Sequence, residues 1–169
     1  MGFVLEATFK HGAGVRVLRS AEDIDQFMAE LLAAGPNYRA ATVYAIDEDT
    51  DADPKHELVV GVDPERELGS VRYAGDDGEF YSRGEQTNPD GVAYNYFGTG
   101  HDFPADSEVP LSVVKQAIAE LLTSGGSRPI PGTLGSGEDG HDCGWWACQV
   151  FVDGFLRWER GALCAADHA

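Results

Sequence analysis

The segment "GSVRYAGDDGEFYSRG", residues 69–84, decides the fold. Two stretches rich in strand-forming residues flank Asp77-Gly78, a dipeptide typical of the tight turn between two antiparallel strands. The segment therefore predicts a β-hairpin. Strands joined by such short turns, without crossover helices between them, build an antiparallel meander, so the flanking sequence determines how far the sheet extends.

Flanking segments of the same character predict more strands on both sides of this hairpin. They are residues 3–10, 15–20, 40–46, 56–63 and 91–98. A further hairpin is expected within residues 145–158, with its turn at Asp153-Gly154. We expect "HDFPADSEVPL", residues 101–111, to be an extended linker. Because crossover helices are absent from the predicted pattern, a doubly wound parallel sheet is excluded.

Two helices are predicted from apolar residues at helical spacing. The first follows Ser20, a good N-cap that forms a capping box with Asp23, and it ends before Gly35-Pro36. The apolar face of this helix consists of Ile24, Phe27, Met28, Leu31 and Leu32.

The second helix spans residues 111–122, with Pro110 at its start and Gly125-Gly126 at its end. Its buried residues are expected to be Val114, Ile118, Leu121 and Leu122. The fold class is therefore α+β, an antiparallel meander of about six to eight strands with two main helices packed on it. We assign residues 1–130 to one domain and 131–169 to a Gly/Pro linker and a Trp/Cys-rich extension packed on the same domain.

The overall charge limits the class of partner. The chain has 12 basic and 29 acidic residues and a formal charge of −17. Such a surface repels nucleic acid and anionic membranes and favours basic protein partners, although acidity also serves solubility alone. No apolar run approaches the roughly 18 residues of a membrane helix, and no signal peptide is recognisable. The three cysteines, an odd number, indicate reduced thiols and a cytoplasmic protein.

Catalytic and metal-binding motifs are scarce, so we expect no catalytic residue, metal or cofactor. The alternative catalytic pair is His101-Asp102, an acid/base couple in a predicted loop. The alternative metal site is zinc bound by His141, Cys143 and Cys148, which lacks a second pair of closely spaced ligands. No nucleophile elbow or phosphate-binding loop is present in the sequence.

Aromatic residues are concentrated on the predicted central strands. They are Tyr73, Phe80, Tyr81, Tyr94, Tyr96 and Phe97. Side chains alternate along a strand, so Tyr94 and Tyr96 share one face. A sheet face that carries tyrosines beside acidic turns would suit protein binding, with rigid rings as anchors and carboxylates for electrostatic attraction. Packing in the core is the alternative for each ring.

The order of these segments resembles a known family. The opening strand pair is followed by "SAEDIDQFMAEL", then by "GSVRYAGDDGEFYSRG" and "YNYFGTGHDFPADSEVPLSVVKQAIAELLTSGGSRP". Over residues 3–129 this pattern resembles actinobacterial members of immunity-protein family one, which are encoded beside polymorphic toxins. The resemblance implies a small cytoplasmic α+β protein that binds and neutralises a cognate toxin, such as a nucleic-acid deaminase or nuclease. The extension after residue 130 departs from the family pattern.

The toxin-binding residues that we expect on this interpretation lie on the hairpin turn, the tyrosine face and the linker. They are Asp76, Asp77, Glu79, Tyr81, Glu85, Tyr94, Tyr96, Asp102 and Asp106. Two other functions stay open. One is a small enzyme or small-molecule-binding protein of a biosynthetic cluster, with a tyrosine-lined pocket and either His101 and Asp102 or the Cys143 region at its mouth. The other is a protein that forms a homodimer through Trp145, Trp146 and Trp158 of the extension.

Overall fold

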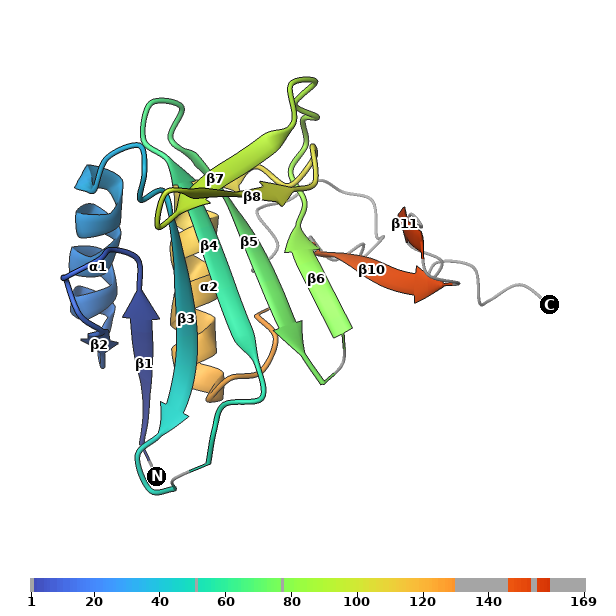
Figure 1. Ribbon diagram of the computed structural model, residues 1–169. Helices are drawn as coiled ribbons and strands as arrows, with labels where there is room; N and C mark the ends of the chain where they lie inside the picture. Colours follow the sequence, from blue (N-terminus) through green and yellow to red (C-terminus); the bar gives the residue numbers. More distant parts are fainter. Residues whose placement is uncertain (1, 51, 77, 130–145, 153–154, 159–169) are drawn as a thin grey trace, which may run out of the picture.

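The computed structural model describes residues 2–50, 52–76, 78–129, 146–152 and 155–158, and it confirms the α+β class and the antiparallel meander (Figure 1). The strands of the main sheet are β1 (Phe3–Thr8), β2 (Arg16–Leu18), β3 (Ala40–Asp47), β4 (Glu57–Asp63), β5 (Leu68–Gly75), β6 (Gly78–Ser82), β9 (Val109–Pro110), β10 (Trp146–Val152) and β11 (Phe155–Trp158). They follow the order β2-β1-β3-β4-β5-β6-β10-β11, and β9 pairs with the end of β5. All of these pairings are antiparallel.

The hairpin that the sequence predicts at residues 69–84 is formed by β5 and β6. Tyr73 pairs with Phe80 and Gly75 with Gly78, so the strands turn at the expected position. Asp77, within this turn, lies outside the described residues. The expected C-terminal hairpin is also present, because β10 pairs with β11 on one side and with β6 on the other.

Two helices lie in the part of the chain that the structure describes, and both pack on the same face of the sheet (Figure 1). Helix α1 (Ala21–Ala33) begins with the predicted capping box, in which the Ser20 hydroxyl accepts from the Asp23 N–H and the Asp23 carboxylate accepts from the Ser20 N–H. Helix α2 (Leu111–Ser124) ends at Gly125, whose φ of 67° permits a left-handed cap. None of the helices in the described residues is long and apolar enough to cross a membrane.

Residue alternation on the strands places the main core between the sheet and the helices. On β4, Leu58, Val60 and Val62 point to the helix side and are fully buried. They contact the apolar faces of both helices, whose buried residues are Ile24, Phe27, Met28 and Leu31 in α1 and Val113, Val114, Ala117, Ile118 and Leu121 in α2. The predicted members Leu32 and Leu122 are half-buried at the edge of this core.

A second, two-stranded sheet departs from the predicted meander. Strands β7 (Val92–Tyr96) and β8 (Thr99–Phe103) form a hairpin that crosses the sheet face opposite the helices (Figure 1). The expected linker at residues 101–111 therefore begins with a strand, which corrects the sequence prediction. The turn consists of Phe97 and Gly98, both with positive φ (50° and 81°). Phe-Gly is not among the dipeptides that favour such a turn, so the sequence signal was missing.

The tip of this hairpin is held by aromatic contacts. Phe97 contacts the ring of His11 at a centroid distance of 4.3 Å, Tyr96 at 4.5 Å and Tyr38 at 6.5 Å, all edge to face. The Asn95 carbonyl also accepts from the Arg39 N–H at 2.8 Å. These contacts fix the hairpin over the sheet at a defined position.

Candidate functional site

The sheet face opposite the helices, called here the open face, is only partly covered by the β7–β8 hairpin. A small second core lies beneath the hairpin, formed by Ala40, Val59, Tyr81, Val92, Tyr94 and Phe103. Tyr94 is 5% exposed, and its ring lies directly on Gly61, where a Cβ would overlap the ring. The Phe103 ring meets Tyr94 at 5.3 Å and Tyr81 at 6.0 Å, both edge to face.

Buried hydroxyl groups anchor the second core to the main sheet. The Tyr94 hydroxyl lies 3.2 Å from Ser70 Oγ, which lies 2.8 Å from Ser107 Oγ. Both serines are fully buried. Burial raises the pKa of Tyr94 to about 12, so the phenol stays neutral. Tyr94 therefore holds the hairpin to the sheet from within.

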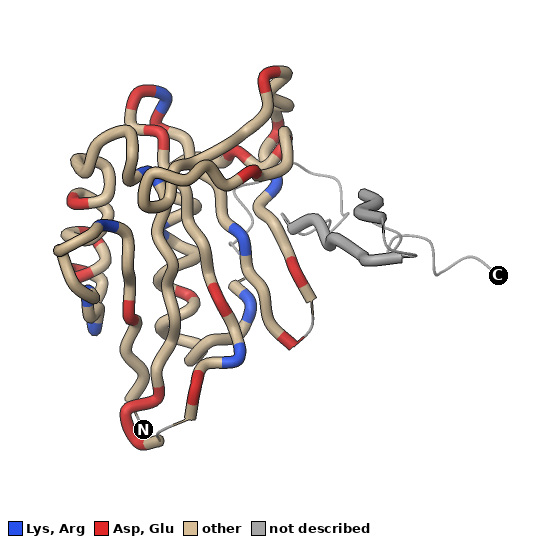
Figure 2. The backbone as a smooth tube through the Cα atoms, viewed as in Figure 1, with Lys and Arg blue, Asp and Glu red and all other residues tan. Residues whose placement is uncertain are grey.

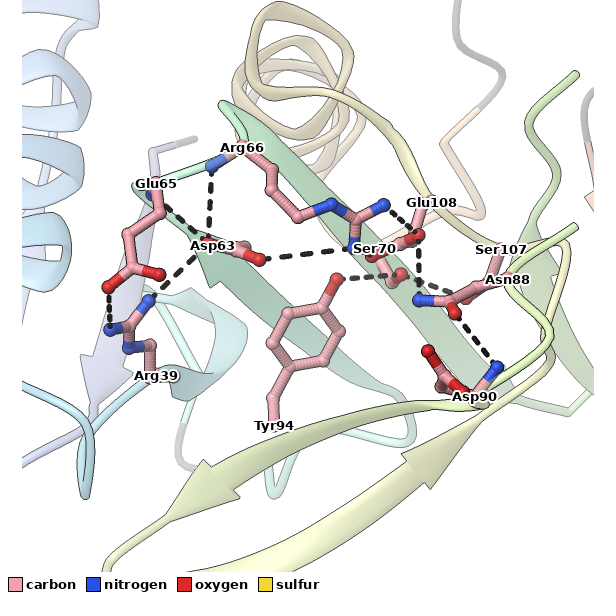
Figure 3. A network of polar contacts seen from close by, with 10 residues as sticks. All are labelled: Arg39, Asp63, Glu65, Arg66, Ser70, Asn88, Asp90, Tyr94, Ser107 and Glu108. Atoms are coloured by element: carbon pink, nitrogen blue, oxygen red, sulfur yellow. Dashed lines mark hydrogen bonds and ion pairs between the residues drawn. The ribbon is translucent and has the colours of Figure 1, made fainter. Parts of the chain in front are cut away.

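Ion pairs fasten the neighbouring edge of the molecule (Figure 3). Arg66, in the β4–β5 turn, donates two hydrogen bonds to Glu108, at 2.6 and 2.8 Å. Arg39 pairs with Asp63 at 3.6 Å and with Glu65 at 3.8 Å. The chain that returns from β8 to α2 is thus clamped to the sheet, and the hairpin has fixed supports at both of its ends.

Below the hairpin, a line of polar side chains crosses four strands of the open face. This polar row consists of Tyr44 on β3, Glu57 on β4, Arg72 on β5, and Glu79 and Tyr81 on β6. The Tyr44 hydroxyl donates to Glu57 at 2.7 Å, and Arg72 donates to the other oxygen of Glu57 at 3.0 Å. Arg72 Nε and the Tyr81 hydroxyl both donate to Oε1 of Glu79.

The polar row is partly desolvated. Burial, followed by the hydrogen bond to Glu57, raises the pKa of Tyr44 to about 12. Burial and the nearby charge of Glu79 also raise the pKa of Tyr81. For Arg72, burial alone would lower the pKa, but the hydrogen bond and charge of Glu79 outweigh it and raise the pKa. Arg72 therefore stays charged between two carboxylates.

A hollow of about 380 Å³ lies where the polar row meets strand β8. It is lined by Val59, Arg72, Glu79, Tyr81, His101, Asp102 and Phe103. The lining combines two carboxylates and one guanidinium with aromatic and aliphatic walls. This composition suits recognition of a polar side chain or a small polar ligand rather than a purely apolar one.

The structure brings three of the predicted partner-binding residues to this hollow, namely Glu79, Tyr81 and Asp102. Tyr94 and Tyr96 share one face of β7, as the alternation predicts. That face is turned toward the sheet, however, and the Tyr96 hydroxyl lies 3.2 Å from Thr42 Oγ1. Both rings therefore serve packing beneath the hairpin.

Three further predicted partner-binding residues that the structure describes, Asp76, Glu85 and Asp106, lie apart from the hollow. Asp76 is exposed in the β5–β6 turn, and Glu85 is exposed in the loop after β6. Asp106 pairs with Arg83 at 3.4 Å. The aromatic set is also divided by the sheet, because Tyr73 and Phe80 belong to the helix-side core.

The sequence analysis did not predict three residues of this site: Arg72 and Val59, which line the hollow, and Glu57, which pairs with Arg72. Arg72 lies directly opposite Val59 on β4 and Tyr81 on β6, so all three face the same side. Applying residue alternation to all the predicted strands, with the register set by the β5–β6 turn, would have placed them together.

The two alternative sites have different outcomes. His101 and Asp102 lie on β8 rather than in a loop, and successive strand residues point to opposite faces. No hydrogen bond joins their side chains in the described part of the chain. His141, Cys143 and Trp145 lie outside the described residues, as do the side chains of Cys148, Trp146 and Trp158. The described residues contain no group of three His, Cys, Asp or Glu side chains arranged to hold a metal.

Comparison with known proteins gives a family match. The model of the family described as Immunity protein Imm1 matches residues 12–131. Among solved structures, a hypothetical protein from Neisseria gonorrhoeae is similar, with 13% sequence identity and a TM-score of 0.41, over 79% of this chain and 92% of that chain. No match was found among curated proteins.

Proposed function

Because the chain belongs to the Imm1 family of immunity proteins, we propose that it binds a cognate toxin with a basic surface and neutralises it by occupying that surface. The family match over residues 12–131 carries this proposal. The formal charge of −17 supports the choice of a basic partner, since complementary charge speeds association and discriminates against partners of like charge.

The charge also favours toxins that act on nucleic acid, such as a deaminase or a nuclease. Enzymes of this kind carry positive grooves that follow the phosphate backbone. Figure 2 shows acidic residues at many positions along the described backbone, and lysine and arginine are fewer in the sequence. A protein of this charge competes for such a groove and needs no catalytic group of its own.

The direct test uses the cognate toxin, which we expect to be encoded beside this protein. We expect the two purified chains to form a complex on size-exclusion chromatography and the toxin's activity to be lost at one equivalent of the immunity protein. Because exposed charges are screened by salt, the association rate constant should fall steeply between 50 and 500 mM NaCl, on the order of tenfold or more. A toxin that stays fully active in saturating immunity protein would refute the proposal.

One observation favours a second function. The hollow lined by Tyr81, His101 and Asp102 is large enough for a small molecule, as expected of a small enzyme or a small-molecule-binding protein on the same scaffold. Turnover of a metabolite by the isolated chain, abolished by His101→Ala, would support this alternative. Dimerisation through the extension and a cytoplasmic location stay predictions, and sedimentation and cell fractionation test them.

A further inference from the structure

We propose that the hollow on the open face receives an arginine side chain of the partner toxin, with Glu79 as its carboxylate acceptor and Asp102 at the rim. This inference rests on the proposed function, because the arginine belongs to the toxin. It adds which part of the surface binds and what chemistry is recognised there.

The first support is the incomplete cover of the sheet. The helices bury one face, whereas the β7–β8 hairpin covers only one end of the other face (Figure 1). The polar row lies on the part that no described residue covers, where the side chains of Glu57, Arg72 and Glu79 are 33%, 29% and 28% exposed. These groups are ordered by mutual hydrogen bonds and still reachable by a partner, so little entropy is lost on binding.

The second support is the alternation of charge along the row. Glu57, Arg72 and Glu79 follow one another as anion, cation and anion. The row ends on Glu79, whose Oε1 accepts two hydrogen bonds, whereas Oε2 accepts none within the described part of the chain. A cation placed at Oε2 would continue the alternation. Asp102 pairs with Ala93 on the outer face of the hairpin and contributes to the rim of the hollow rather than to its floor. It is exposed, has no ion pair to any described residue, and adds a second negative charge nearby.

The third support is the wall of the hollow, which distinguishes arginine from other groups. Tyr81 and Phe103 line the hollow beside the two carboxylates with the small parts that the second core leaves accessible, 8% and 7% of each residue. A guanidinium bonds carboxylates through a planar array of donors, and it is more weakly hydrated than an ammonium group, so it tolerates a partly apolar lining better. An anionic group would meet Glu79 and Asp102, and Arg72 is already neutralised by two glutamates. Arginine therefore fits better than lysine, and both fit better than an acid.

A peptide probe tests this inference without the toxin. The probes are acetyl-Gly-Arg-Gly-amide and three analogues in which lysine, citrulline or glutamate replaces the arginine. In ¹⁵N-resolved NMR titrations of the full chain, we expect the arginine probe to shift the amide signals of Glu79, Tyr81, Asp102 and Phe103. The signals of α1 and α2 should not move. The citrulline probe should bind about three- to tenfold more weakly, because its side chain has no charge.

Matched variants separate local recognition from general acidity. Glu79→Gln keeps an acceptor for Arg72 and removes one charge, Asp102→Asn does the same at the rim, and Asp53→Asn removes one charge from the exposed β3–β4 loop. We expect the first two to weaken the arginine probe about three- to tenfold and Asp53→Asn to change its affinity less than twofold. If Glu79→Gln disturbs the fold, the arginine site is still tested by the affinity of Asp102→Asn for the probe and by which amide signals of the wild-type chain shift.

The outcomes distinguish this inference from the proposed function. Shifts spread evenly over the surface, equal effects of all three substitutions, or stronger binding of the glutamate probe would overturn the arginine site. If the toxin is neutralised by the wild-type chain and equally well by Glu79→Gln and Asp102→Asn, the immunity function stands and the assignment of its surface falls.

Discussion

The two faces of the central sheet come from the same strands and are built in opposite ways. On the helix side, Leu58, Val60 and Val71 are 0% exposed and contact apolar residues from both helices. On the open face, their strand neighbours Glu57 and Arg72 are 33% and 29% exposed and belong to a line of hydrogen bonds. Consecutive residues on β4 and β5 therefore have different roles. Those that face the helices stabilise the fold, and those on the open face are accessible for contact.

The largest effect is expected when the helix face is broken. Phe27, 2% exposed in the centre of α1, contacts Phe9 edge to face at 5.8 Å. Phe27→Ala leaves a large void and should lower the free energy of unfolding by about 3–5 kcal/mol. Val59→Ala, on the open face beneath the hairpin, removes less buried volume and should lower the free energy of unfolding by about 1 kcal/mol. Urea denaturation of both variants checks the comparison, and equal losses would contradict it.

A smaller and more local effect is expected at the contact between the hairpin and the sheet. Gly61→Ala places a methyl group into the Tyr94 ring and should lower the free energy of unfolding by about 1–3 kcal/mol. Because the clash lies on the open face, β7 and β8 should gain amide hydrogen exchange while α1 and α2 stay protected. The control is Ala93→Ser, on the exposed surface of β7. Gly91→Ala would be unsuitable, because Gly91 has a φ of 80°, a backbone conformation that disfavours alanine.

The polar row should respond to loss of its central cation. Arg72→Met keeps much of the aliphatic packing and leaves Glu57 and Glu79 facing each other without a positive charge. Since both glutamates are about a third exposed, solvent screens the repulsion, and we expect a loss of about 1 kcal/mol in the free energy of unfolding. The double variant Arg72→Met with Glu79→Gln should recover part of it. A double variant no more stable than the single one would argue against direct coupling.

The smallest effect concerns pH. His56 Nε2 accepts from the Ala45 N–H at 2.9 Å, and burial lowers the pKa of His56 below its ordinary 6.5. The unfolded chain therefore binds the proton more readily, so the folded state should lose stability as the pH falls below about 6.5 and reach a plateau above it. His56→Gln, which offers a neutral acceptor, should have a flatter profile between pH 5 and 7 in urea denaturation.

Local signals were sufficient for much of the fold. Asp77-Gly78 and the capping box at Ser20 each specify a structure within a few residues, and both the hairpin and the start of α1 lie where they predict. The apolar spacing of α2 likewise predicted Val114, Ile118 and Leu121 of its buried face. Such features depend on near neighbours, so no long-range information was required.

The site was harder to predict because it depends on register across several strands. Chemical type alone singles out Glu79, Tyr81 and Asp102, whereas a lone arginine such as Arg72 carries no motif. The role of Tyr94 depended on Gly61, which is 33 positions away in sequence and makes room for the ring only after β4 and β7 are placed. The second sheet was missed for a related reason, since its Phe97-Gly98 turn is maintained by distant aromatic contacts rather than by favourable turn residues.

The unusual backbone of Phe97 has a consequence for how this family member can change. A left-handed phenylalanine costs roughly 1–3 kcal/mol wherever it occurs. His11 and Tyr38, which come from two distant segments, and the adjacent Tyr96 offset that cost through ring contacts. A substitution of His11 or Tyr38, far from the hairpin in sequence, would therefore change the orientation of β7 and β8 above the hollow while every residue of the two strands stays the same.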